Sequence, residues 1–216
     1  MGQKVNPKSY RLSLTKDWQA KWFATKNYKN YLAEDDKIRN IIKKQLPKAT
    51  VSKTNITRNN QDVVIDIYTS RPGIVIGRSG EGTNKLKTLI DKVTSRGKIK
   101  LNIFEVKNPE TNAQLIAEVI ALQVEKRIAF RRAIKQALAK ARDKGVKGIK
   151  VKISGRLNGV EIARKETFSF GPMPLQTLKS KIDYAKVDAL TTYGVIGIKV
   201  WIYEGINKAK ATKDTE

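Results

Sequence analysis

Hydrophobic side chains recur along this chain with two different periods, and the changes between them predict its elements. Behind the acidic residues 34–36, apolar side chains recur at helical spacing as Ile38, Ile41, Ile42 and Leu46. We expect a helix whose acidic residues lie at its positive N-terminal end and which ends at Pro47. Residues 49–58 and 61–70 then indicate two strands, joined by an Asn-Asn turn at residues 59–60.

The same unit continues through a glycine-rich loop into another helix and a third strand. An apolar segment, residues 74–76, precedes the loop and is expected in the core. Apolar side chains recur after the loop at helical spacing as Leu86, Leu89, Ile90 and Val93. Residues 98–106 indicate the third strand, because apolar and polar side chains alternate along most of them. Residues 36–107 thus predict a small α+β domain, a three-stranded sheet with helices, behind an N-terminal arm at residues 1–35.

A helical unit begins after Asn108, Pro109 and Glu110. Residues 111–143 lack Gly and Pro, and two stripes of apolar side chains recur along them at helical spacing. The first stripe is Leu115, Val119 and Leu122. The second stripe is Phe130, Ile134, Ala137, Leu138 and Ala141. The pattern predicts two helices here, or one helix and its continuation.

The rest of the chain is strand-rich. Asn158 and Gly159 give a hairpin signal between the first two segments, and a Tyr-Gly pair at residues 193–194 marks the turn between the last two. With the two helices ahead of them, these strands predict a second α+β domain with a four-stranded sheet at residues 108–206. Residues 207–216 have no apolar pattern and are expected to form a mobile tail.

The net charge of the chain restricts its possible functions more than any single motif does. The sequence has 44 Lys and Arg against 20 Asp and Glu, a formal net charge of +24. A compact chain with this charge repels itself unless a polyanion neutralises it, and nucleic acid is the polyanion that we expect. An anionic membrane surface is the alternative, but it usually requires one amphipathic basic helix with bulky apolar anchors, whereas these cations are spread along the chain.

Missing residue types exclude much enzyme chemistry. The sequence has no Cys and no His, and therefore no disulfide, no thiolate nucleophile and none of the commonest general base or metal ligand. We expect no enzyme activity, no cofactor and no metal site. No apolar run is long enough to cross a bilayer, and the first residues lack the apolar core of a signal peptide, so we expect a cytoplasmic protein that binds no membrane.

Aromatic and basic side chains interleave in the N-terminal arm. The aromatic residues are Trp18, Trp22, Phe23, Tyr28 and Tyr31. The basic residues include Lys4, Lys8, Arg11, Lys16, Lys21 and Lys26. Such side chains can stack on bases and pair with phosphates, or the aromatics can pack the arm onto the next domain. The sequence leaves both open, and Lys4, Lys8 and Arg11 are candidate contacts to nucleic acid phosphates.

The second apolar stripe has a cationic counterpart on the same helix. The basic residues that fall on one face, away from that stripe, are Arg131, Arg132, Lys135 and Arg142. A solvated charged face is the ordinary alternative to a phosphate-binding one. Near the hairpin, Arg156 and Arg164 are further candidate phosphate contacts by their charge.

Gly77, Arg78, Ser79 and Gly80 form a G-x-x-G loop between two helical segments. The glycines let the backbone approach a sugar-phosphate strand, and the amides that begin the next helix can donate hydrogen bonds to phosphate. Arg78 adds a positive charge. The order of elements around the loop resembles the type II KH fold, a module for single-stranded nucleic acid. The loop does not match the G-x-x-x-x-G-K-[ST] pattern of nucleotide-binding loops.

Five segments, in order, resemble the bacterial-type small-subunit ribosomal protein S3 family. They are MGQKVNP, RPGIVIGRSGE, FRRAIKQAL, GIKVKISGRLNGVEIAR and DYAKVDALTTYGVIGIKVWIY. The resemblance implies a structural RNA-binding protein in the head of the 30S subunit that contacts 16S rRNA and the head proteins S10 and S14, not a homo-oligomer. It also implies that a basic helix guides mRNA, and helps to unwind it, where mRNA enters the ribosome. The matching residues here are Arg131, Arg132 and Lys135. On this resemblance, the candidate rRNA contacts are Lys4, Lys8, Arg11, Arg142, Arg156 and Arg164.

Two other functions are weighed on the residues alone. A free KH-domain regulator or assembly factor would require partner domains, such as a GTPase, that the sequence does not show. A nuclease or a lyase acting on damaged DNA would need paired carboxylates or a lysine with a lowered pKa in a pocket, and the sequence singles out neither.

Overall fold

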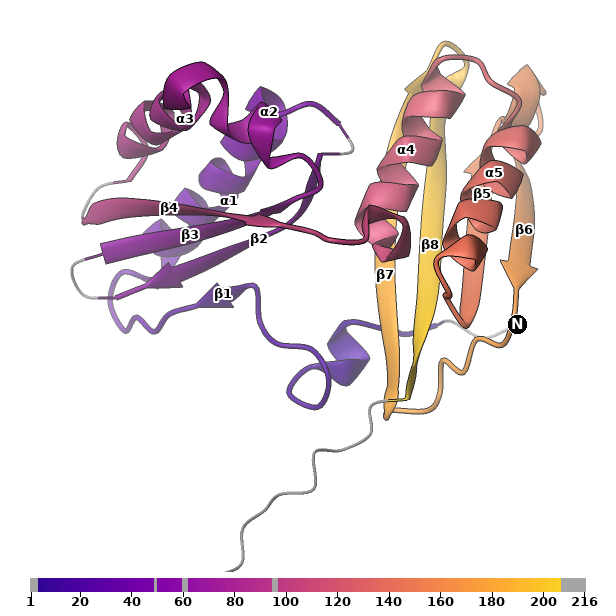
Figure 1. Ribbon diagram of the computed structural model, residues 1–216, viewed down its shortest axis with the longest axis horizontal. Helices are drawn as coiled ribbons and strands as arrows, with labels where there is room; N and C mark the ends of the chain where they lie inside the picture. The colour runs from indigo at the N-terminus through magenta and orange to yellow at the C-terminus, as the bar shows by residue number, and fades with distance from the viewer. Residues whose placement is uncertain (1–3, 49, 60–61, 95–96, 207–216) are drawn as a thin grey trace, which may run out of the picture.

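The computed structural model describes residues 4–206 except 49, 60–61 and 95–96. The expected turn residue Asn60 and the expected mobile tail at residues 207–216 lie outside the described residues. Two α+β units stand side by side in Figure 1, and the N-terminal arm runs along the lower side of the view from one unit to the other.

In the first unit, helices cover one face of a mixed four-stranded sheet (Figure 1). Its elements are β1 (Ala20–Lys21), α1 (Tyr28–Gln45), β2 (Val51–Arg58), β3 (Asp62–Thr69), α2 (Pro72–Ile76), α3 (Glu81–Asp91) and β4 (Lys98–Glu105). The strand order is β1-β2-β3-β4, with β2 and β3 antiparallel and β3 and β4 parallel. The expected three-stranded sheet with helices is confirmed, and the arm adds β1 parallel to β2.

Alternation along β3 builds the core of this unit. Val63, Ile65 and Ile67 are buried, while the residues between them are half-buried. They pack against Ile38 and Ile42, two members of the stripe expected on the first helix. Each such side chain contributes about 1.5–3 kcal/mol when fully buried, so this helix is fixed on the sheet by its apolar stripe.

The expected position of the acidic residues in the first helix is wrong. Helix α1 begins at Tyr28, so Glu34 and Asp35 lie inside it and are buried. They are buried because Arg58 of β2 reaches them: its Nη1 donates to Glu34 Oε2 at 2.7 Å and its Nη2 to Asp35 Oδ1 at 2.6 Å. The division of the chain at residues 35 and 36 stays a prediction, and α1 runs across it.

In the second unit, two helices pack on one face of an antiparallel sheet (Figure 1). Its elements are α4 (Ala113–Glu125), α5 (Phe130–Asp143), β5 (Gly148–Gly155), β6 (Arg164–Phe170), β7 (Ser180–Thr191) and β8 (Gly194–Ile206). The strand order is β6-β5-β8-β7. The expected α+β fold with two helices and a four-stranded sheet is confirmed.

The two helices differ in how well their stripes could be predicted. On α5, Phe130, Ile134 and Ala141 are buried in the core, as expected. On α4 the expected stripe is wrong in part, because Val119 is 40% exposed and the buried side includes Ile120 instead. Apolar residues lie on almost every side of α4, so their spacing does not single out one face.

Both expected turns of the sheet are present, although one is wider than a tight hairpin. Strand β5 pairs with β6 from Gly155 and Arg164 onwards, and eight residues separate these strands. Asn158 and Gly159 have φ of 58° and 80°, the left-handed conformation that these residue types tolerate. Strands β7 and β8 are joined by the two residues 192–193.

Candidate nucleic-acid interface

The G-x-x-G loop has the backbone that its glycines permit. Gly77 and Gly80 have φ of 71° and 79°, and Ser79 between them has φ of 49°. A Cβ on Gly77 would lie 3.0 Å from the amide nitrogen of Gly82, so a larger residue would strain a turn that is already left-handed. Arg78 is exposed at the tip. The loop therefore presents backbone and one cation to the surface.

Two features beside this loop suit a ligand. No side chain caps the start of α3, whose N-cap residue is Gly80. The amide of Glu81 donates to the carbonyl oxygen of Arg78, so only the amides that follow it in the first turn remain as donors to an acceptor such as phosphate. The preceding segment was expected in the core, and this is wrong for two residues: Ile74 and Ile76 are 45% and 40% exposed, and only Val75 is buried. A five-residue helix such as α2 has one buried side and leaves its other residues at the surface.

The expected cationic face of α5 exists as a surface. Arg131, Arg132 and Lys135 line one hollow together with Ala129 and Gln136, at the start of α5. All three cations are exposed. The helical periodicity was sufficient to predict this face because the opposite side carries a continuous apolar stripe.

The three cations of this face are not equivalent. Glu166 of β6 accepts hydrogen bonds from Arg131, from Nη2 at 2.9 Å and from Nε at 3.3 Å. This carboxylate raises the pKa of Arg131 through the hydrogen bond and the charge. Within the described part of the chain, Arg132 and Lys135 have no ion-pair partner. The face thus combines one fixed guanidinium with two free cations.

The loop between the helices adds two cations that the sequence did not single out. Lys126 and Arg127 are exposed between α4 and α5, and Arg127 has φ of 61°. The break in the helix falls at this left-handed residue. No Gly or Pro signals it, so the sequence could not distinguish two helices from one continuous helix.

The candidate rRNA contact at Arg11 is wrong. Arg11 is fully buried, and its guanidinium donates to the carbonyl oxygens of Leu175 at 2.7 Å and of Ser180 and Thr177 at 2.9 Å. It also donates to the carbonyl oxygen of Pro7 at 3.2 Å. Arg11 therefore fastens the arm to the second unit and has no donor facing a ligand.

The other candidates in the arm remain at the surface to different degrees. Lys4 is exposed, whereas Lys8 lies 3.6 Å from Asp183 and is partly neutralised by it. Of the aromatic residues, Trp22 packs the arm onto α1 and donates from Nε1 to Asp35 Oδ2 at 2.8 Å. Phe23 is 89% exposed. Trp22 thus packs the arm onto the next domain, and Phe23 is accessible for stacking on a base; these are the two uses that the sequence left open.

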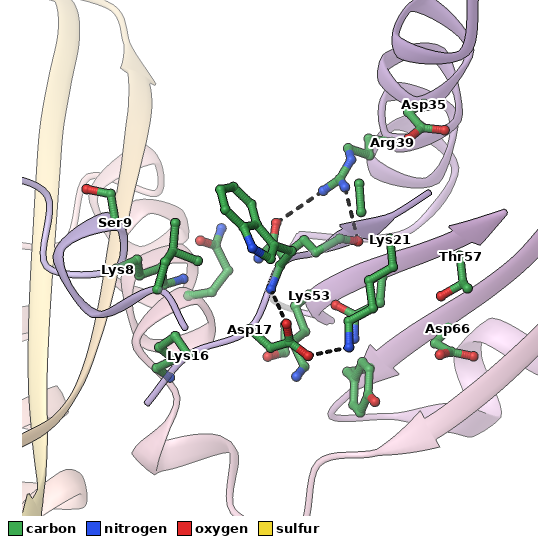
Figure 2. Close-up of a pocket in the computed structure, with 18 of the residues that line it drawn as sticks. Lys8, Ser9, Lys16, Asp17, Lys21, Asp35, Arg39, Lys53, Thr57 and Asp66 are labelled. Atoms are coloured by element: carbon green, nitrogen blue, oxygen red, sulfur yellow. Dashed lines mark hydrogen bonds and ion pairs between the residues drawn. The ribbon is translucent and has the colours of Figure 1, made fainter. Parts of the chain in front are cut away.

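A cleft of about 1680 Å³ lies between the arm, the first unit and the start of the second unit. Figure 2 shows Lys8 and Lys16 of the arm on one side of it and Arg39 of α1 on the other. Most of its charges are paired inside the protein, as Lys16 Nζ is with Asp183 Oδ1 at 3.5 Å and Lys21 is with Asp17. Arg39 donates to the neutral amide oxygen Oε1 of Gln19 at 3.1 Å. The side chains that line the cleft therefore mainly bind the arm and the two units to one another.

The remaining candidates occupy three positions on the second unit. Arg142 lies over the ring of Phe170, with Cζ 5.1 Å from the ring centroid. Arg156 donates from Nε to the carbonyl oxygen of Val160 at 3.0 Å, which holds the loop between β5 and β6. Arg164 begins β6 and is exposed. All three lie away from the G-x-x-G loop, which belongs to the first unit.

Metal and membrane chemistry find no support in the described residues. Among them, no group of three or more Asp and Glu side chains is arranged to hold a metal ion. No helix formed by these residues has the length and hydropathy needed to span a bilayer.

Comparisons with known proteins identify both units. Residues 37–111 match the family model described as "KH domain", and residues 120–202 match "Ribosomal protein S3, C-terminal domain". The "Small ribosomal subunit protein uS3" of Clostridium botulinum (strain Okra / Type B1) is 52% identical over 206 residues, 95% of this chain and 92% of that protein. Those of Desulforamulus reducens and Streptococcus suis are 53% and 50% identical over 95% of this chain and cover 93% and 94% of the relatives.

Fold, charge and family models together define an RNA-binding protein of the KH class. The identity of 52% over 95% of its length further shows that the chain belongs to the uS3 family of small ribosomal subunit proteins. The expected resemblance is thereby confirmed, and the protein is a structural component of the ribosome and not an enzyme.

Proposed function

We propose that this protein sits in the head of the small subunit, bound to 16S rRNA, and lines the channel through which mRNA enters. There the cationic face of α5 guides the message and helps to unwind it. The observation that carries this proposal is the single hollow shared by Arg131, Arg132 and Lys135 on an exposed helix face. Cations that only interact with solvent need not gather around one hollow, whereas a phosphate chain is held by several cations at once.

The geometry suggests how the face would act. Glu166 already orients the guanidinium of Arg131, so little further side-chain entropy is lost when that guanidinium binds a phosphate. Arg132 and Lys135 supply the uncompensated charge that attracts the strand. A single strand gripped in this way and pulled by translocation would enter while its paired partner is left outside. The work comes from translocation, so the protein itself needs no ATP site.

The first unit would hold rRNA through its loop. Arg78 and the amides that follow Glu81 in the first turn of α3, which no side chain caps, would face a sugar-phosphate backbone, and the left-handed glycines keep side chains out of its way. The further rRNA contacts that we propose are Lys4, Lys8, Arg142, Arg156 and Arg164. The neighbours proposed from the family resemblance are the head proteins S10 and S14.

The test is translation by small subunits that carry Arg132→Ala and Lys135→Ala together. We expect the variant protein to enter the subunit normally, because these side chains make no contact that holds the fold. Translation of a message with a stable hairpin should slow severalfold, while an unstructured message should be read at the normal rate.

The matched control removes two exposed cations of α1, with Lys43→Ala and Lys44→Ala, and should slow neither message. If the α5 variant fails to enter the particle, the face is an rRNA anchor and not a guide for mRNA. If wild-type protein is recovered only outside small subunits after a moderate salt wash, the alternative of a free KH-domain regulator or assembly factor is favoured.

A further inference from the structure

Three lysines lie directly opposite one another on the outer face of the second sheet, the face away from α4 and α5. In the strand register, Lys152 of β5 pairs with Lys199 of β8, and Lys199 pairs with Lys186 of β7. The neighbours of each lysine along its strand, such as Ile198 and Val200, are buried in the core under the helices. The lysines therefore point to the other side of the sheet. We call Lys152, Lys199 and Lys186 the lysine row.

Such an arrangement destabilises an isolated sheet. Directly opposed side chains have Cβ atoms about 4.5–5.5 Å apart, and like charges at this spacing repel. Within the described residues, Lys152 and Lys199 have no acidic partner, and Lys186 has only Asp188 at 3.9 Å, between two exposed side chains. A pair of that kind neutralises little.

More positive charge surrounds the lysine row. Lys150 is the next outward-facing residue of β5, two positions before Lys152, and burial, Lys4 and Lys152 together lower its pKa. The proximity of Lys4 shows that the start of the arm reaches the same face. Four lysines of the sheet and one of the arm thus gather where the described chain supplies one weakly placed carboxylate.

We propose that the lysine row is a second RNA-binding surface, which holds the sugar-phosphate backbone of one strand across the sheet. This rests on the proposed function only in taking RNA as the partner. The proposed path of mRNA along α5 lies on the helix side of this unit, and the row lies on the opposite side. The second unit would then be held between two segments of RNA, which explains why both of its faces are cationic.

Charge complementarity favours RNA over other partners. A strand brings one phosphate per nucleotide, so three adjacent lysines can each meet a phosphate and their mutual repulsion becomes attraction to a common ligand. Lysine suits this role because it acts as a mobile point charge, without the planar fork that reads a particular group. We therefore expect binding that does not depend on base sequence and that weakens with salt.

The experiment measures binding of a fluorescein-labelled oligouridylate to the full chain by anisotropy over a range of salt concentrations. The test variant carries Lys152→Gln, Lys199→Gln and Lys186→Gln. We expect affinity at low salt to fall by roughly tenfold or more. The slope of log K against log salt should fall by about 2, since each phosphate contact on a single strand contributes about 0.7.

A matched control removes the same charge from exposed positions of α1, with Lys37→Gln, Lys43→Gln and Lys44→Gln, and should change affinity much less. Loss of fold cannot imitate the expected result, because removal of repelling lysines should leave thermal unfolding unchanged or raise its midpoint. Equal effects of the two triple variants would overturn the proposal and leave the proposed function untouched. Absence of binding by wild-type protein at low salt would overturn both.

Acetylation of lysines, read by mass spectrometry, locates the ligand. Oligouridylate should protect Lys199 and Lys152 from acetylation, and inorganic phosphate at the same phosphate concentration should not. Equal protection by phosphate would overturn the proposal in favour of a general anion site. Protection by oligoglutamate but not by oligouridylate would overturn it in favour of an acidic protein partner.

Discussion

The arm and the outer face of the second sheet use the same kinds of side chain in opposite ways. In the arm, Lys8 and Lys16 lie 3.6 and 3.5 Å from Asp183, and Arg11 is surrounded by backbone carbonyl oxygens. On the sheet, Lys152 and Lys199 face each other across adjacent strands with no acidic partner among the described residues. One set of cations is neutralised by the protein itself, and the other is left for a ligand.

This difference shows that a net charge of +24 is not a uniform property of the surface. Some acidic side chains lie where parts of the chain are joined, as Asp35 and Asp183 illustrate. Cations beside them stabilise the fold, and cations far from them repel one another. Removal of a paired cation should therefore cost stability, whereas removal of an unpaired one should cost RNA binding.

The largest effect is expected from Arg58, the buried cation that joins β2 to α1. Arg58→Met should lower the free energy of unfolding by about 3–5 kcal/mol, because it removes the guanidinium that pairs with both buried carboxylates, Glu34 and Asp35. Urea unfolding of the full chain would measure this. The control Arg39→Met removes a half-buried arginine of α1 that bonds only to Gln19 among the described residues, and should cost less than about 1 kcal/mol. Equal costs would mean that burial does not separate the two sets of cations.

A smaller loss is expected at Arg11. Arg11→Lys keeps the charge but cannot reach carbonyl oxygens on several sides, so we expect a loss of about 2–3 kcal/mol in the free energy of unfolding. Lys4→Met, at an exposed position of the same arm, should change stability by less than about 0.5 kcal/mol. If Arg11→Lys instead weakens RNA binding without a loss of stability, the original expectation of an rRNA contact at Arg11 is restored.

These two arginines show where sequence reasoning stops. The cationic face of α5 could be predicted because the helical period alone places Arg132 on one side of the helix and the apolar stripe on another. Arg11 could not be placed, because its acceptors are backbone carbonyls of residues 174–180, which any sequence supplies. Arg58 could not be placed either, because its carboxylate partners, Glu34 and Asp35, lie on another element, α1.

The lysine row illustrates the same limit at the level of strand register. The lysines of the row are far apart in the sequence and belong to no motif. Only the antiparallel pairing of β5, β8 and β7 brings Lys152, Lys199 and Lys186 into one line. Alternation predicts which face a residue takes, but a shift of one residue in register would have moved each lysine to the other face. The G-x-x-G loop, in contrast, could be found because its geometry is encoded by adjacent glycines.

Asp183 offers a pH-dependent measure of the paired set. Burial by itself would raise the pKa of Asp183, but Lys16, Lys8 and the amide of Ala113 together hold it below its ordinary value. Its contribution to stability is therefore present above about pH 4 and is lost as the pH falls through the lower pKa of the folded state. Asp183→Asn should cost about 1–2 kcal/mol at neutral pH, and the difference from wild type should shrink in acid. Urea unfolding from neutral pH into acid would show this, and a difference that is constant with pH would contradict the pairing.

The smallest expected effect has the opposite sign and is the sharpest test of the comparison. Lys199→Gln should raise the free energy of unfolding by about 0.5 kcal/mol at low salt, since it relieves repulsion from Lys152 and Lys186. Lys181→Gln lies on the same sheet but removes a lysine paired with Glu204, and should lower it by a similar amount. At about 1 M salt both differences should shrink, because the Debye length falls to about 3 Å and these mostly half-buried charges are partly screened. If Lys199→Gln destabilises the chain at low salt, that lysine is neutralised within the protein and the division between the two sets of cations fails.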